Sequence, residues 1–174
     1  MSQSNRPVPA CAVVVVSDRR SRQQAEDTTG PVIAEWIATR GWTAVPTVSV
    51  PDDAGALSKE LVRLTDEGVN LVLTTGGTGL GARDVTPEAT LAVAHRVVPG
   101  IHEWIRASTG ANLPAAFLSR GVAVLRDSTL IVNLPGSPRA VSEYLAHLGK
   151  ILPHALAQVR SAPGSPDADR HPTE

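Results

Sequence analysis

Continuous apolar runs alternate along the chain with segments in which apolar residues recur every three or four positions. The continuous runs, residues 10–17 and 69–75, are rich in Val and Leu, which is typical of strands covered on both faces of a parallel sheet. Helical spacing is shown by Ile33, Trp36 and Ile37 and by Leu57, Leu61 and Leu64. The alternation predicts a single three-layer α/β domain with a mostly parallel central sheet and helices on both faces.

Two further segments complete the expected sheet. Residues 42–50 have a strand pattern, but Pro46 lacks the N–H that a central strand needs, so we expect this strand at the edge. Residues 122–125 and 130–134 flank a polar turn at Asp127. This spacing predicts a hairpin, which would add an antiparallel strand to the sheet.

Proline and glycine mark the expected ends of the later helices. The Thr-Pro pair at 86–87 predicts the start of a third helix, and the Pro-Gly pair at 99–100 predicts its end. Residues 101–119 have a helical pattern in two pieces. Ser137 is a good cap for the C-terminal helix, and we expect Pro153 to break or restart that helix.

The composition indicates the limits of the domain and argues against general binding of nucleic acid or anionic membranes. Of 174 residues, 42% are hydrophobic and 19% are charged, which favours one globular domain. The polar, Pro-rich ends predict flexible tails at 1–9 and 161–174 around a domain at 10–160. The formal net charge of -1 gives no general attraction for nucleic acid or anionic membranes, so any anion site must be local.

The sequence gives no sign of export or membrane insertion. The longest apolar run, residues 10–16, is far shorter than the roughly 20 residues of a membrane helix. Charged Asp18 and Arg19 follow that run where a signal peptide would carry small residues. The single cysteine, Cys11, cannot form an internal disulfide. We therefore expect a cytoplasmic protein.

Four loops should follow the carboxyl ends of the parallel strands, which is where open α/β sheets bind ligands. They lie at residues 17–18, 51–53, 74–79 and 133–138. The loop at 74–79 reads Thr-Thr-Gly-Gly-Thr-Gly, so its N–H groups can approach an anion without intervening Cβ atoms, and its hydroxyls add donors. A tight strand-to-helix turn is the structural alternative, but it needs fewer Thr and Gly residues. The loop therefore predicts phosphate binding.

Charged residues next to these loops suggest nucleotide chemistry. Arg83 offers a guanidinium for phosphate, and Asp84 offers a carboxylate for hydrated Mg²⁺. Alternatively, Asp84 is a helix-entry acid and Arg83 a solvated surface charge. Asp52 could equally cap the next helix, and capping alone would explain Ser137.

Two familiar nucleotide motifs fit less well. Gly77, Gly79 and Ala82 match the spacing of a dinucleotide-binding loop, but they follow the third strand rather than the first. The helix also begins only at Thr86. A P-loop is excluded because the chain has no Gly-Lys-Ser/Thr ending after these glycines.

Several motifs occur together and in order. They are Thr-Thr-Gly-Gly-Thr-Gly at 74–79, Arg-Asp-Val-Thr-Pro-Glu-Ala at 83–89, Asn-Leu-Pro-Gly-Ser-Pro at 133–138, Ser17-Asp18, Pro51-Asp52, Pro99-Gly100 with Glu103, and Leu118-Ser119-Arg120. This combination resembles the molybdopterin-binding family of molybdenum-cofactor biosynthesis, of the MogA/MoaB type. The resemblance covers nearly the whole domain.

The resemblance implies an enzyme that binds molybdopterin and adenylylates its terminal phosphate with Mg·ATP as co-substrate, releasing pyrophosphate. Asp84 and Asp52 would be the functional acids and the Mg²⁺ ligands. Pterin and nucleotide would be bound by Thr74, Thr75, Gly76, Gly77, Thr78, Gly79, Arg83, Asn133, Pro135, Gly136, Ser137, Ser17 and Asp18. The resemblance also implies a homotrimer or a higher multiple, with a cofactor-insertion protein as a partner.

Two other functions are compatible with the same motifs. A non-catalytic protein could keep the fold to bind molybdopterin and hand it over without using ATP. An oligomeric scaffold for a protein partner is a third hypothesis. An assay for molybdopterin-dependent adenylylation distinguishes the enzyme from both.

Overall fold

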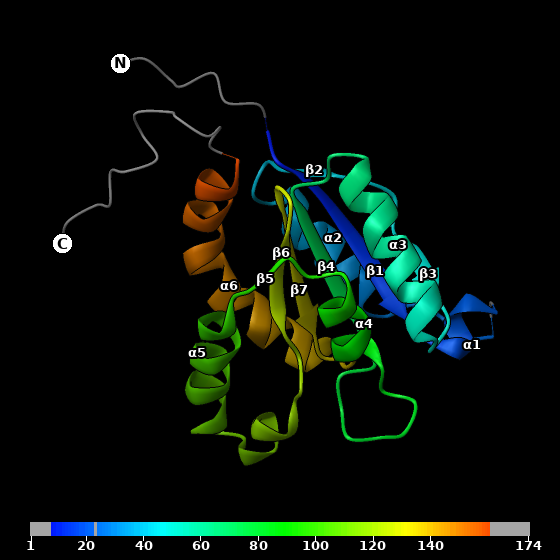
Figure 1. The fold of residues 1–174 in the computed structure, drawn as a ribbon. Helices are drawn as coiled ribbons and strands as arrows, with labels where there is room; N and C mark the ends of the chain where they lie inside the picture. Colours follow the sequence, from blue (N-terminus) through cyan, green and yellow to red (C-terminus); the bar gives the residue numbers. More distant parts are fainter. Residues whose placement is uncertain (1–7, 23, 161–174) are drawn as a thin grey trace, which may run out of the picture.

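The computed structural model describes residues 8–22 and 24–160 (Figure 1). The elements are β1 (Ala10–Val16), α1 (Asp18–Ser21), α2 (Gly30–Ala38), β2 (Thr43–Ala44), β3 (Val48–Val50), α3 (Ala54–Asp66), β4 (Leu71–Thr75), α4 (Thr86–Ala92), β5 (Arg96–Val97), α5 (Pro99–Gly110), the 3-10 helix η1 (Pro114–Leu118), β6 (Ala123–Arg126), β7 (Thr129–Leu134) and α6 (Pro138–Val159).

The strands form one mixed sheet in the order β2-β1-β4-β7-β6-β5, and β3 also pairs with β1. Neighbouring strands are parallel from β2 through β7, whereas β6 runs antiparallel to both β7 and β5. The hairpin turns at Asp127, which has a φ of 48°. The mostly parallel sheet and the antiparallel hairpin strand predicted from the sequence are both confirmed.

The outer strand beside β1 is divided in two. Thr43 pairs with Ala10 in β2, and Val48 pairs with Val14 in β3. Pro46 lies between the two pieces and cannot donate a ladder hydrogen bond. The edge position predicted from this proline is confirmed.

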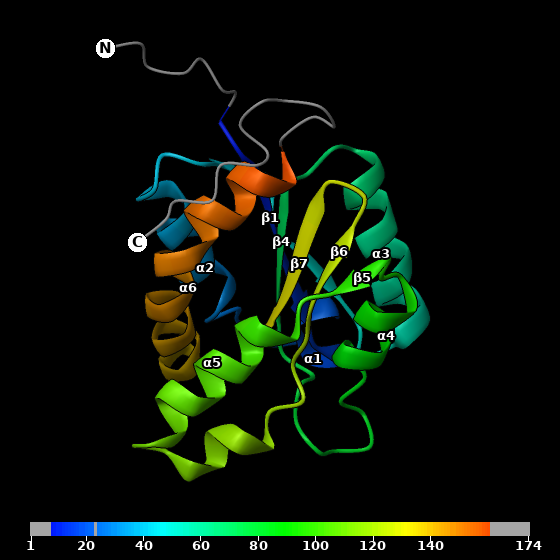
Figure 2. The same ribbon diagram turned by 60° about the vertical axis from the view of Figure 1, so that its left-hand side comes forward.

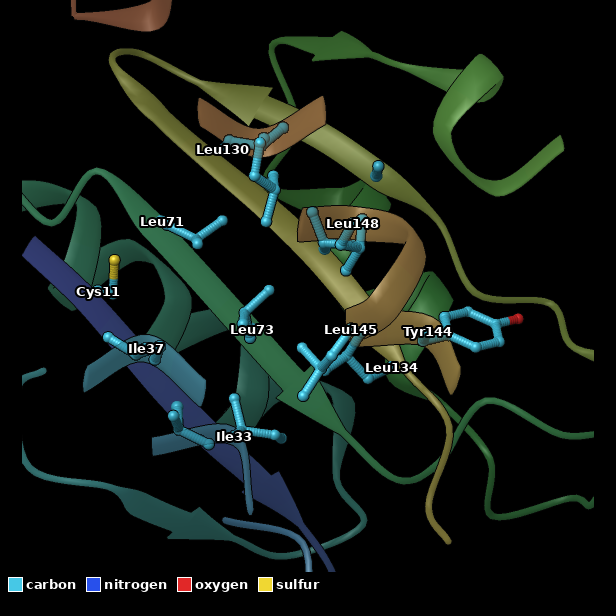
Figure 3. Close-up of a cluster of buried hydrophobic side chains, with 14 of the residues drawn as sticks. Cys11, Ile33, Ile37, Leu71, Leu73, Leu130, Leu134, Tyr144, Leu145 and Leu148 are labelled. Atoms are coloured by element: carbon cyan, nitrogen blue, oxygen red, sulfur yellow. The ribbon is translucent and has the colours of Figure 1, made fainter. Parts of the chain in front are cut away.

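Helices cover both faces of the sheet, as Figure 2 shows: α2, α5 and α6 lie on one side and α3 and α4 on the other. Side chains alternate along the strands, so that Cys11 of β1 faces the first layer and Ala12 faces the second. The first layer includes Ile33 and Ile37 of α2 and Leu145 and Leu148 of α6 (Figure 3). Burial on both faces explains why the central strands are continuously apolar.

Two helix boundaries differ from the prediction. Helix α4 ends at Ala92, and the short strand β5 follows it. Pro99 begins α5 instead of ending the preceding helix, because its fixed φ and missing N–H suit a first helical turn. Pro153 lies inside α6 without ending that helix. Leu152 and Leu156 are buried on either side of it, and their packing keeps this segment helical.

The described part of the chain contains no helix that is both long and apolar enough to cross a membrane. The predicted tail at 161–174 and most of the one at 1–9 lie outside the described residues.

His102 of α5 is a buried titratable group with 1% exposure. Its ring packs under Gly121, where an added Cβ would lie 2.9 Å from the His102 Cε1 atom. Burial, together with the charge of Arg106, lowers the pKa of His102 from 6.5 to about 4. Between these two values the unfolded chain binds more protons at this residue than the folded chain does.

This difference predicts a loss of stability on acidification. The contribution of His102 is fully present above pH 6.5 and is lost as the pH falls towards about 4. The free energy of unfolding should fall by up to about 1.4 kcal/mol per pH unit in this window because of His102 alone. Urea unfolding of the parent protein and of His102→Leu at several pH values measures the difference. Parallel pH profiles for the two proteins would contradict the assignment.

Candidate active site

Four loops with polar residues meet at one edge of the sheet. Strands β1, β3, β4 and β7 are parallel, so their carboxyl ends lie together. The chain leaves β1 towards α2 on one face and leaves β4 towards α4 on the other. The site therefore lies at a topological switch point, where α/β sheets characteristically bind ligands. The loop from β4 to α4 extends below the sheet in Figure 1.

Close backbone contact joins three of these loops. Gly76 has a φ of +97°, and a Cβ at this position would lie 2.5 Å from the carbonyl oxygen of Val16. A Cβ on Gly136 would lie 3.4 Å from the Cα of Gly76. The hydroxyl of Thr75 donates to the carbonyl of Pro135 at 2.7 Å. The ends of β1, β4 and β7 are therefore packed together, and only glycine fits at residue 76.

Thr86 fixes the other side of the same loop. Its hydroxyl donates to the carbonyl of Gly76 at 2.9 Å, and its N–H donates to the carbonyl of Gly77 at 3.1 Å. Gly77 has a φ of +63°, and a Cβ there would lie 2.5 Å from the Thr86 hydroxyl oxygen. The sequence indicated Thr86 only as a helix start. Its second role in shaping the loop depends on a contact between residues ten positions apart.

Backbone donors remain available at the centre of the site. Among the residues that the structure describes, the N–H groups of Gly77, Thr78 and Gly79 bond to no acceptor. The same holds for the N–H groups of Gly136 and Ser137 on the neighbouring loop. Successive unpaired N–H groups in a tight turn form an anion-binding arrangement. Binding of phosphate by this loop stays a prediction from the Thr-Gly pattern.

A buried polar layer lies behind this loop. The Asn133 side chain, 1% exposed, donates to the hydroxyls of Thr74 at 3.0 Å and Thr90 at 2.9 Å. Its oxygen accepts the N–H of Val122 at 3.1 Å. Asn133 and Thr74 were predicted as ligand contacts, but the structure places their side chains in internal bonds that join β4, β7 and α4. In this structure they support the loop from behind.

The acids of the first two loops bond to each other's backbone. The N–H of Asp18 donates to the Asp52 carboxylate at 3.2 Å, and the N–H of Asp52 donates to the Asp18 carboxylate at 3.0 Å. The N–H of Ser17 donates a hydrogen bond to the carbonyl of Val50 at 2.9 Å. Asp53, not Asp52, caps α3 by accepting the N–H of Ala56. Asp52 therefore does not cap α3, which was one of the two roles that the sequence left open for it.

Arg83 connects this acidic pair to the glycine loop. Its guanidinium lies 3.2 Å from the Asp18 carboxylate, and its side chain is 79% exposed. The neighbouring Asp84 carboxylate accepts the N–H of Gly81 at 2.8 Å. The residue that precedes α4 is Val85, and no side chain caps that helix. Asp84 thus shapes its own loop instead of capping α4.

Arg120 is the contact that sequence reasoning did not assign to the site. Its Nε donates to the carbonyl of Gly79 at 2.7 Å, and its terminal nitrogens bond the carbonyl of Asp84 and the carboxylate of Glu88. The N–H of Arg120 also donates to the carbonyl of Thr78 at 2.9 Å. The hydrogen bond from Arg120 lowers the pKa of Glu88. The only sequence signal was the Leu-Ser-Arg motif at 118–120.

The structure brings the predicted loops together but does not group the residues of a complete metal site. The loops at 74–79 and 133–138 and the Arg83-Asp84 pair lie together as expected. Within residues 8–22 and 24–160, however, no three His, Cys, Asp or Glu side chains are grouped to hold a metal ion. In the described part of the chain no Arg, Lys or His is paired with the Asp84 or Asp52 carboxylate, which fits a divalent ion shared with phosphate oxygens.

The fold and this edge define an α/β domain with a glycine-rich loop at the topological switch point of its sheet. Residues 12–154 match the family described as "Probable molybdopterin binding domain". The chain belongs to this molybdopterin-binding family, as the resemblance of its motifs predicts.

Named relatives and a solved structure agree with this membership. Molybdopterin adenylyltransferase of Escherichia coli K12 is 40% identical over 151 residues, covering 83% of this chain and 77% of the relative. The molybdenum cofactor biosynthesis bifunctional protein of Synechococcus elongatus is 39% identical over 86% of this chain, which spans only 47% of that relative's length. The structure of MoaB from Thermus thermophilus has a TM-score of 0.84 at 42% identity, covering 91% of this chain and all of the other.

The contact at Gly76 predicts a specific effect of a methyl group. Gly76→Ala should lower the free energy of unfolding by about 1–3 kcal/mol more than Gly41→Ala does, because of the added clash with Val16. Gly41 is the matched control, since it also has a positive φ but nothing within 4 Å of an added Cβ. Equal losses in urea unfolding would show that the contact with Val16 does not constrain this loop.

Proposed function

We propose that the protein is a molybdopterin adenylyltransferase that uses Mg·ATP and releases pyrophosphate. The main support for this proposal is that unpaired N–H groups from two loops lie at the same edge of the sheet as the carboxylates of Asp18, Asp52 and Asp84. The Escherichia coli relative, which is named for this activity, supports the proposal at 40% identity.

The reaction places particular demands on such a site. An oxygen of the terminal phosphate of molybdopterin attacks the α-phosphorus of ATP, and the bond from that phosphorus to the bridging oxygen breaks. The AMP group is transferred, and the electron pair leaves with pyrophosphate. The attacking phosphate is already an anion, so the step needs alignment and charge stabilisation more than proton removal.

The residues present divide these tasks. The N–H groups at 77–79 and 136–137 are placed to bind phosphate oxygens and to orient them. Arg83 is exposed, so it can exchange Asp18 for a phosphate group at little cost. Asp84 and Asp52 would hold Mg²⁺, which when bound neutralises the charge of the triphosphate.

Other expectations from the sequence stay predictions. They are the homotrimer or higher multiple, the cofactor-insertion protein as partner, the cytoplasmic location, and the limits of the domain at 10–160 with its two tails.

Substitution of the acids tests the proposal. Asp84→Asn and Asp52→Asn should each lower turnover by on the order of 10²-fold or more, because each removes a carboxylate that would hold the Mg²⁺ needed to neutralise the triphosphate. Asp53→Asn is the matched control, since Asn also caps helices and Asp53 is adjacent to Asp52. The measurement is pyrophosphate release with purified protein, molybdopterin, Mg²⁺ and ATP, with the product identified by mass.

The same assay separates the alternatives. Equal turnover in the parent and Asp84→Asn would contradict the role of this acid. Binding of molybdopterin without an adenylylated product would instead support the non-catalytic carrier. If molybdopterin does not bind at all, the scaffold hypothesis would be favoured.

A further inference from the structure

We propose that Arg120 is a positioning residue for the reaction, because it fixes the shape of the loop that carries Asp84. This inference rests on the proposed function for its kinetic consequence. Its structural part, the fixing of the loop, can be tested in the absence of any substrate.

One guanidinium bonds two positions, Gly79 and Asp84, of the loop between β4 and α4. Its Nε bonds the carbonyl of Gly79, where the glycine-rich segment ends, and a terminal nitrogen bonds the carbonyl of Asp84. The backbone N–H of Arg120 adds a bond to Thr78. Residues 79 and 84 are therefore fixed relative to each other from a segment more than thirty residues further along the chain.

The segment that supplies Arg120 is itself held in place. Arg106 of α5 donates from one nitrogen to the carbonyls of Ser119 and Gly121, both at 3.3 Å. The two residues flanking Arg120 are thus bonded to α5, and the Arg120 side chain bonds the glycine loop. Helix α5 belongs to the layer across the sheet from α4. Arg120 therefore connects the site loop to a different layer of the fold.

The loop between the two anchored carbonyls is closed by Asp84. Its carboxylate accepts the N–H of Gly81 at 2.8 Å, and its own N–H donates to the carbonyl of Gly81 at 2.9 Å. A Cβ at Gly79 would lie 3.0 Å from the same carboxylate. Release of the carbonyls of Gly79 and Asp84 from Arg120 should therefore free the carboxylate as well.

Glu88 supports the guanidinium from α4. Both oxygens of its carboxylate contact Arg120, and its side chain is 55% exposed. A planar guanidinium can bond several acceptors at fixed angles, whereas the ammonium of lysine is a point charge on a flexible stem. Lysine at residue 120 should therefore keep the charge but lose the geometry.

The test combines kinetics with amide hydrogen exchange of the full chain. Arg120→Lys and Arg120→Gln should each lower kcat by about 10- to 100-fold, with KM for molybdopterin changed by less than about twofold. In the ligand-free proteins, exchange at the Gly81 amide should be at least about tenfold faster. Glu88→Gln should lower kcat only about two- to fivefold, because an exposed ion pair contributes little.

Controls separate a loop effect from general unfolding. Exchange in β4 should stay unchanged in every variant. Arg63→Gln removes another arginine that bonds two glutamates, Glu60 and Glu67, but lies on α3. It should leave both the kinetics and the Gly81 exchange unchanged.

Three results would overturn the inference: parent-like kinetics and exchange in Arg120→Lys, a loss of kcat with unchanged Gly81 exchange, or a loss of protection that extends into β4. If the parent protein forms no adenylylated product, the proposed function fails, and the exchange measurement still decides whether Arg120 fixes the loop.

Discussion

Three backbone segments approach one another at Val16, Gly76 and Gly136, and the geometry of the site depends on this contact. A side chain at Gly76 would overlap the carbonyl of Val16, so the close approach is limited to glycine. Strands β1 and β7 flank β4 and run parallel to it, so the carboxyl ends of the three strands can meet in this way. The following N–H groups are then left free for a ligand instead of being used in a helix or a strand.

The carboxylates at this edge, those of Asp18, Asp52, Asp84 and Glu88, outnumber the guanidiniums of Arg83 and Arg120. Asp18 and Asp52 bond each other's N–H groups, and Arg83 offsets part of their charge. Arg120 is paired with Glu88. Under the proposed function, recognition of an anion would depend on oriented N–H groups and on exposed guanidiniums such as that of Arg83.

The sequence predicted the parts of this structure that depend on local pattern. Buried strands show as continuous apolar runs, Pro46 marks the sheet edge, and the Thr-Gly loop marks the edge at which the four loops meet. The errors arise where tertiary packing overrides a local rule, as at Pro153, where buried leucines keep α6 continuous. Asn133 and Arg120 could not be placed for the same reason. Their partners, Thr90 and Asp84, are distant in sequence, so no spacing rule indicates whether these side chains face the ligand or the protein.

A crystal structure of the protein with molybdopterin and a non-hydrolysable ATP analogue tests the central claim most directly. In this complex, oxygens of the terminal phosphate should accept hydrogen bonds from the N–H groups at 77–79, with the α-phosphorus of the nucleotide positioned for in-line attack. A phosphate bound at another edge of the sheet, with these N–H groups still unpaired, would contradict it.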